Sequence, residues 1–113
     1  MLKKYLNKKI EVTIDRPINT AHPKHKNIIY KLNYGYIKNT VSGDGEEIDV
    51  YLLEEEKPVE TVLAKVIAII HRFNDCEDKL VAVPLNSKIK YTKEMIYNLV
   101  SFQEKYFESE IIM

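Results

Sequence analysis

Segments in which apolar and polar residues alternate, or in which apolar residues follow one another, predict a chain built mainly from strands. Ile10–Ile14 alternates strictly, as a half-buried strand does, whereas Val66–Ile70 is apolar throughout, which is typical of a strand buried on both faces. Asn27–Ile37 is rich in Ile and Tyr, which favour strands. The five predicted strands are Ile10–Ile14, Asn27–Ile37, Glu47–Leu53, Val62–His71 and Lys79–Val83.

Beyond Pro84 the spacing of apolar residues becomes helical. Thr92 is a suitable N-cap residue, and from Ile96 to Phe107 the positions that share one helical face are apolar except Gln103. Several strands followed by one C-terminal helix favour a mainly β fold, a small closed barrel, over a parallel α/β sheet. Gly and Pro residues are spread singly, and no linker or repeat interrupts the chain. We therefore expect a single domain, residues 1–113.

The charge balance and the cysteine count exclude several classes of protein. The 113 residues include 17 basic and 17 acidic side chains, and a formal net charge of zero argues against a strongly cationic nucleic-acid or membrane binder. No apolar run is long enough to span a membrane, and we expect no signal peptide. The single cysteine, Cys76, excludes an internal disulfide and a Cys-based zinc cage. We expect a cytoplasmic protein.

The charges are nevertheless unevenly distributed along the chain. Residues 1–31 contain eight basic and two acidic side chains, whereas residues 32–60 contain two basic and eight acidic ones. This segregation either brings two opposite fields together in the fold or forms two separately solvated surfaces.

The acidic segment Gly43–Val50 is the strongest candidate for chemistry. Four of its residues are carboxylates, and strand alternation places Glu47 and Asp49 on the same face. Crowded carboxylates attract hard cations such as Mg²⁺ or Mn²⁺, and a solvated acidic hairpin is the alternative. A second acidic cluster, at residues 75–78, could share metal ions with the first if the two strands are neighbours.

Basic and aromatic side chains offer partners for an anionic ligand. Arg binds phosphate in bidentate fashion and Lys binds it as a point charge, although each could also be an ordinary surface residue. The tyrosines at positions 30, 34 and 36 share one strand face, where they either pack in the core or line a polar pocket. The two histidines of segment 22–25 favour a polar loop over a soft-metal site. The basic candidates are Arg16, Lys24, Lys31, Lys38 and Lys79.

Taken in order, three segments resemble the family I soluble inorganic pyrophosphatases. They are Tyr30–Ile37, Asp44–Val50 and Lys79–Pro84, the last preceded by acidic residues. The tail Phe102–Phe107 is similar to the late helix of that family, and Ile14–Pro17 is a looser match to its first strand on the metal side. The resemblance covers most of the chain.

The resemblance implies a five-stranded OB-like barrel that hydrolyses inorganic pyrophosphate to two phosphates with a water activated by Mg²⁺, Mn²⁺ being the second candidate. The catalytic residues would be Glu46, which helps to activate the water, Lys79 and Tyr34. The substrate would be bound by Arg16, Lys24, Tyr34, Lys79 and Tyr106. The metal ligands would be Asp15, Asp44, Asp49, Asp75 and one or both of Glu77 and Asp78.

Three departures from the family pattern leave other functions open. Glu46 stands where the signature has an aspartate, Phe107 stands where a lysine usually follows the late tyrosine, and the chain is shorter than usual. The alternative is a catalytically degenerate module that binds metal and a phosphate ligand, or an enzyme that hydrolyses another phosphoanhydride. A third hypothesis, an OB-like nucleic-acid binder, is disfavoured because the acidic motif repels phosphate. We expect a small-molecule substrate, a homo-oligomer, and no nucleic-acid or membrane partner.

Overall fold

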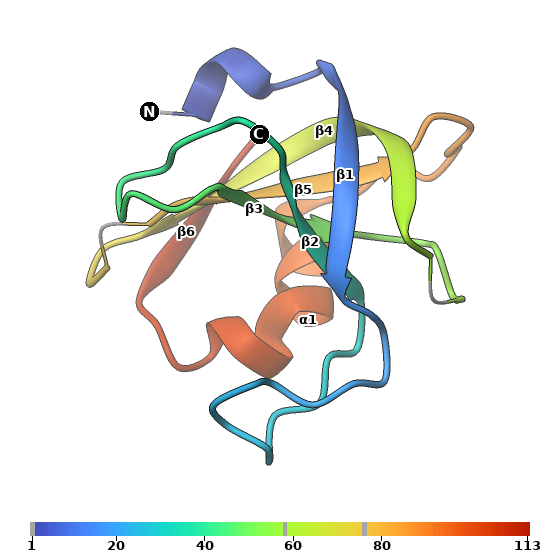
Figure 1. The fold of residues 1–113 in the computed structure, drawn as a ribbon. Helices are drawn as coiled ribbons and strands as arrows, with labels where there is room; N and C mark the ends of the chain where they lie inside the picture. Colours follow the sequence, from blue (N-terminus) through green and yellow to red (C-terminus); the bar gives the residue numbers. More distant parts are fainter. Residues whose placement is uncertain (1, 58, 76) are drawn as a thin grey trace.

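The strands of the computed structural model, which describes residues 2–57, 59–75 and 77–113, close into a barrel with one helix packed beside it (Figure 1). The expected mainly β fold with a five-stranded barrel and a C-terminal helix is confirmed. The elements are η1 (Leu2–Tyr5), β1 (Lys9–Arg16), β2 (Asn33–Ile37), β3 (Ile48–Leu52), β4 (Thr61–Arg72), β5 (Lys79–Pro84), α1 (Lys93–Glu104) and β6 (Ser109–Ile112).

The barrel closes through β4, the longest strand. The order of strands is β1-β2-β3-β5-β4, and β4 pairs in turn with β1, where Val12 lies opposite Val62. Residues 69–72 of β4 pair with the additional strand β6. A register shift between Val66 and Ala68 marks a β-bulge, which bends a strand and increases its twist. β4 can therefore contact β1 near its start and β6 near its end.

Burial on both faces of the sheet explains the apolar pattern of the strands. On β3, Val50 belongs to one core cluster, while Tyr51 belongs to a second cluster that includes residues of α1. On β4, Ile69 lies in the first cluster and Ile70 in the second. The prediction that the apolar run Val66–Ile70 of β4 is buried on both faces is confirmed.

The segment before β2 is a loop rather than a strand. Of the predicted strand Asn27–Ile37, only Asn33–Ile37 pairs in the sheet. Ala21 forms an isolated bridge with Ile29, and the backbone N–H of Tyr30 donates to the carbonyl of Thr20. The prediction was wrong for residues 27–32 because β propensity does not specify the backbone partner, which here is the preceding loop.

Helix α1 begins where predicted and ends earlier. The Thr92 side chain accepts a hydrogen bond from the backbone N–H of Met95 at 3.2 Å, which confirms the N-cap. The helix ends at Glu104, so Tyr106 and Phe107 lie in the turn that leads to β6. The expectation of a helix through Phe107 was wrong because apolar spacing alone does not show where the chain reverses. The sequence pattern gave no prediction of β6.

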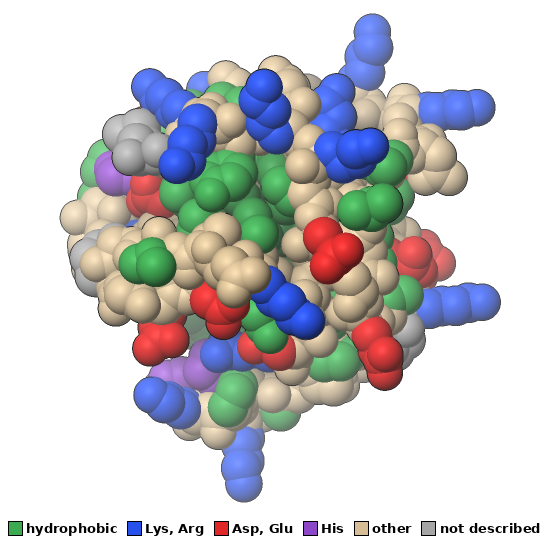
Figure 2. Space-filling model, turned by 45° about the horizontal axis from the view of Figure 1, so that its top comes forward, with side chains coloured by type: hydrophobic (Ala, Val, Ile, Leu, Met, Phe, Trp, Pro, Cys, Tyr) green, Lys and Arg blue, Asp and Glu red, His purple; other side chains and the backbone are tan. Residues whose placement is uncertain are grey.

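Charged side chains cover much of the exterior. On the face drawn in Figure 2, Lys and Arg side chains project around the edge, and Asp and Glu side chains lie among them. Within the part of the chain that the structure describes, no helix is both long enough and apolar enough to cross a membrane.

Gly35 marks the closest approach of β1 and β2. A Cβ atom at this position would lie 2.0 Å from the backbone carbonyl oxygen of Thr13. We expect Gly35→Ala to lower the free energy of unfolding by about 2 kcal/mol, because the backbone of β1 must move to relieve the clash. Urea denaturation followed by circular dichroism measures this change.

Gly45→Asn provides the control for that substitution. Gly45 has a φ of +85°, a region that Asn tolerates, and no described atom lies within 4 Å of a Cβ built there. A side chain at this φ is strained even in open space, so the free energy of unfolding of Gly45→Asn should fall by less than about 1 kcal/mol, a smaller loss than for Gly35→Ala. Equal stabilities of the Gly35→Ala variant and the parent would contradict the close approach.

Candidate active site

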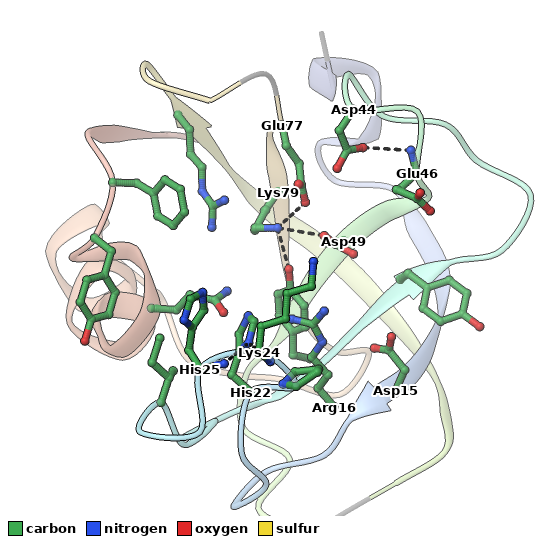
Figure 3. A pocket seen from close by; sticks show the side chains of 18 of the residues that line it. Asp15, Arg16, His22, Lys24, His25, Asp44, Glu46, Asp49, Glu77 and Lys79 are labelled. Atoms are coloured by element: carbon green, nitrogen blue, oxygen red, sulfur yellow. Dashed lines mark hydrogen bonds and ion pairs between the residues drawn. The ribbon is translucent and has the colours of Figure 1, made fainter.

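A pocket of about 1000 Å³ opens where the loop at residues 17–28 meets the segments that precede β3 and β5 (Figure 3). Arg16 and Lys24, from the basic first part of the sequence, share its wall with Asp44 and Asp49 from the acidic part. The fold therefore brings side chains of the basic segment 1–31 and of the acidic segment 32–60 together around one pocket. The acidic lining residues are Asp15, Asp44, Glu46, Glu47, Asp49 and Glu77, and the Lys and Arg residues are Arg16, Lys24, Arg72 and Lys79.

The ammonium group of Lys79 is buried in the floor of the pocket. Because β3 and β5 run parallel in this register, Asp49 lies beside Lys79. Lys79 Nζ donates to Tyr34 Oη at 2.6 Å, to Asp49 Oδ2 at 2.9 Å and to a carboxylate oxygen of Glu77. Its side chain is only 4% exposed. Two carboxylates and a phenol thus compensate a charge that would otherwise be costly to bury.

The carboxyl groups of Asp44, Asp49 and Glu77 lie on one side of the pocket, here called the acidic wall, and share hydrogen bonds. Burial, together with hydrogen bonds to Asp49 and Asp44, raises the pKa of Glu77 to about 8. Hydrogen bonds from Ser42 and Glu77 lower the pKa of Asp44 to about 2. Burial alone would raise the pKa of Asp49, but a hydrogen bond from Glu77 and the charge of Lys79 lower it. The shared hydrogen bonds thus raise the pKa of Glu77 and lower those of Asp44 and Asp49, while the ammonium of Lys79 lies against Asp49 and Glu77.

Arg16, at the end of β1, forms part of the opposite wall. Its Nη1 donates to Tyr30 Oη at 2.5 Å, and its guanidinium lies 5.4 Å from the centroid of the Tyr34 ring. Tyr30 and Tyr34 are both buried, and each hydroxyl has a hydrogen-bond partner. The two functions suggested for these tyrosines, core packing and pocket lining, are combined in Tyr34.

The loop beyond β1 adds further basic groups to this wall. The Nδ1 atom of His22 accepts the backbone N–H groups of Lys24 at 3.0 Å and of His25 at 3.2 Å. Figure 3 shows His22, Lys24 and His25 on the side of the pocket opposite Asp44 and Glu77. Burial and the nearby charge of Arg16 lower the pKa of His22. The prediction of a polar loop for this segment is confirmed.

Two of the predicted site residues lie outside this pocket. Asp75 accepts a hydrogen bond from Arg72 Nη1 at 3.1 Å, and Asp78 Oδ1 lies 2.9 Å from His71 Nδ1. The other ten predicted residues line the pocket: Asp15, Arg16, Lys24, Tyr34, Asp44, Glu46, Asp49, Glu77, Lys79 and Tyr106.

The sequence gave no prediction of a buried polar group whose members Arg72 and Gln103 also line the pocket. Arg72 donates from Nε and Nη2 to the two carboxylate oxygens of Glu104, at 2.9 and 2.6 Å. The guanidinium carbon of Arg72 also lies 3.6 Å from the centroid of the Phe107 ring. Arg72 ends an apolar strand and gave no signal in the sequence. Gln103, the polar exception on the apolar face of the helix, was the one residue that could have indicated this group.

The acidic wall has the donor chemistry for a hard divalent cation. All its candidate ligands are carboxylate oxygens, which Mg²⁺ and Mn²⁺ prefer. Among residues 2–57, 59–75 and 77–113, no three His, Cys, Asp or Glu side chains are gathered closely enough to form a ready-made metal cage. Mg²⁺ is usually held by one or two carboxylates together with water and substrate phosphates. The residues present fit that open form of coordination.

Comparisons with known proteins give the family and the fold that this chain resembles. The family model described as inorganic pyrophosphatase matches residues 3–110. The inorganic pyrophosphatase of Saccharolobus solfataricus is 32% identical over 113 residues, covering 88% of this chain and 62% of the relative, and that of Campylobacter jejuni is 32% identical, covering 69% and 44%. The crystal structure of inorganic pyrophosphatase from Ehrlichia chaffeensis has the same fold, with a TM-score of 0.70, 19% identity, and coverage of 95% of this chain and 86% of that one.

The chain thus spans between 44% and 62% of the length of these two curated relatives. The family model nevertheless matches nearly all of its residues, including the three motifs and the pocket that they form. The chain belongs to the inorganic pyrophosphatase family.

Proposed function

We propose that this chain hydrolyses inorganic pyrophosphate to two phosphates, using Mg²⁺, or Mn²⁺ as the second candidate. The observation that supports the proposal best is the pocket itself. An acidic wall suited to divalent cations faces a basic wall suited to phosphate, and the buried ammonium of Lys79 lies between them. A small ligand that contains both metal ions and phosphate groups matches this arrangement of charge.

The acidic wall is the proposed metal site. Asp15, Asp44, Asp49 and Glu77 line the pocket and would hold the cations. We prefer Glu77 to Asp78 because Asp78 is engaged by His71, and Asp75 is placed against Arg72. The chemistry that bound divalent cations supply in such a site is activation of a water molecule and neutralisation of phosphate charge.

Phosphate binding is assigned to the basic wall and the floor. Arg16 can bind phosphate oxygens in bidentate fashion, and Lys24 and Lys79 can act as point charges. Tyr34 and Tyr106 would donate hydroxyl groups to the remaining oxygens. These contacts would hold the substrate in line for attack and stabilise the charge that develops on the departing phosphate.

Glu46 is the proposed acceptor of the proton from the attacking water. It lies in the turn before β3, where its backbone N–H donates to Asp44 Oδ1 at 3.0 Å. This hydrogen bond places Glu46 beside a proposed metal ligand, and Glu46 itself lines the pocket. Compared with aspartate, glutamate extends the carboxylate by one methylene group.

The remaining features of the proposal concern the protein as a whole. We propose a single pyrophosphatase-like domain, residues 1–113, in a cytoplasmic homo-oligomer that acts on a small molecule. No nucleic-acid partner is proposed, because the acidic wall would repel a phosphate backbone in the absence of metal.

Hydrolysis is tested by phosphate release from pyrophosphate with Mg²⁺. We expect turnover by the parent protein, loss of turnover when EDTA removes the metal, and at least about a 100-fold lower rate for Asp49→Asn, because an amide is a poorer ligand for a hard cation. Glu60→Gln changes an exposed acidic residue outside the pocket and should leave the rate unchanged.

Phosphate release at the buffer rate by the parent protein would contradict the proposed hydrolysis. Calorimetry then decides between the alternatives. Saturable binding of Mg²⁺ and pyrophosphate without product would identify a degenerate binding module, and the absence of binding would exclude that function as well.

Glu46→Gln tests the proposed proton acceptor. We expect kcat to fall about 100-fold while KM changes less than about threefold, because the amide cannot accept the proton but keeps the shape of the side chain. Glu46→Asp keeps a carboxylate and should lose less activity than Glu46→Gln. Steady-state kinetics with Mg²⁺ and pyrophosphate measures both parameters. A kcat for Glu46→Gln equal to that of the parent would show that another group accepts the proton.

A further inference from the structure

A line of hydrogen bonds connects the buried Arg72–Glu104 pair to Arg16 at the wall of the pocket. Tyr30, Tyr51, Gln103 and Glu104 are buried, Gln103 being 6% exposed, whereas Arg16 at the pocket end of the line is half-buried. The links are Tyr51 Oη to Glu104 Oε2 at 2.7 Å, Gln103 Nε2 to Tyr51 Oη at 2.6 Å, Tyr30 Oη to Gln103 Oε1 at 2.8 Å and Arg16 Nη1 to Tyr30 Oη at 2.5 Å.

Glu104 determines the direction of the first link. Its carboxylate receives two N–H donors from Arg72, so it is ionised and can only accept hydrogen bonds. Tyr51 must therefore donate its single hydroxyl proton to Glu104. The Tyr51 oxygen can then only accept from Gln103, which requires the amide NH₂ group on that side.

The orientation of the Gln103 amide determines which group donates and which accepts at Tyr30 and Arg16. With its NH₂ group toward Tyr51, its carbonyl oxygen faces Tyr30, and Tyr30 must donate its hydroxyl proton to that carbonyl. The Tyr30 oxygen can then accept a hydrogen bond from Arg16 Nη1 through a lone pair. A reversed amide would set two acceptors against each other, because the Tyr51 oxygen has no second proton.

We propose that Gln103 is a positioning residue that holds the guanidinium of Arg16 in one orientation for substrate phosphate. This inference rests on the proposed function, in which Arg16 contacts the substrate. With Nη1 held by Tyr30, the other N–H groups of Arg16 bond to no side chain in the part of the chain that the structure describes, so they can present a fixed fork to phosphate oxygens, a geometry that a mobile guanidinium does not keep.

The surroundings of Gln103 support this role. The same face of α1 buries Ile96 and Val100, so an apolar residue would suit position 103. A buried amide is costly unless its polar atoms are hydrogen-bonded. Here the carbonyl and the amide nitrogen bond to the two tyrosines that lead toward Arg16 and Glu104.

Gln103→Met tests the proposal, because it keeps the length of the side chain and removes both polar groups. We expect KM for pyrophosphate to rise about tenfold with kcat within about twofold of the parent value, because Arg16 loses its fixed orientation. Tyr30→Phe breaks the next link and should give a similar rise in KM. Ser101→Ala, on the same helix but outside the line, should leave both parameters unchanged.

Combining Gln103→Met with Arg16→Lys shows whether Gln103 acts by positioning the Arg16 guanidinium or only by packing in the core. Lysine binds phosphate as a point charge and does not need the fork geometry, so Gln103→Met should raise KM by less than about twofold in this background. A tenfold rise in both backgrounds, or a fall in kcat at unchanged KM, would overturn the proposal.

Side-chain NMR of Arg16 tests the same inference without turnover. In the parent protein, restricted rotation should give resolved signals from the Arg16 guanidinium N–H groups, and Gln103→Met should average them. Resolved signals in that variant would contradict the positioning role. If the parent protein neither binds nor hydrolyses pyrophosphate, the proposed function fails, and the NMR result alone decides whether Gln103 orients Arg16.

Discussion

The buried ammonium of Lys79 holds β2, β3, β5 and the segment before β5 together at the floor of the pocket. Removing such a charge from water costs several kcal/mol unless close acceptors compensate for it, and here Tyr34, Asp49 and Glu77 provide that compensation. Glu77 lies two residues before Lys79, but Tyr34 and Asp49 come from distant positions in the sequence, so the convergence depends on the closed barrel. The same convergence gathers the carboxylates that make the pocket suitable for divalent cations.

A second buried cation, Arg72, stabilises the packing of the helix against the barrel. Its pairing with Glu104 joins the end of β4 to the end of α1, and Tyr51 and Gln103 extend the contact into the core. The two buried cations differ in their surroundings. Both side chains line the pocket, but Lys79 is held by other pocket-lining residues, whereas the guanidinium of Arg72 bonds to both carboxylate oxygens of Glu104 and to Asp75 and lies over the ring of Phe107. We therefore assign phosphate binding to Lys79 and a structural function to Arg72.

The sequence predicted those parts of the fold and site that are encoded locally. The barrel strands, the Thr92 cap and most pocket residues lie in segments with a clear period or a compact motif. Strand β6 could not be predicted because its backbone partner β4 is distant in the sequence, and the loop at residues 27–32 could not be predicted because strand propensity does not show that its partner is the preceding loop. The sequence also did not distinguish Glu77, which faces the pocket, from Asp78, which pairs with His71, because the direction of each side chain depends on the neighbours that the fold brings beside it.

The position of a bound cation tests the central claim most directly. Crystals of the full chain soaked with Mn²⁺ and pyrophosphate, measured by anomalous scattering, should show a metal peak between Asp44, Asp49 and Glu77. Phosphate density should lie toward Arg16 and Lys79. A metal peak confined to Asp75 and Asp78, or the absence of any peak within the pocket, would contradict the account.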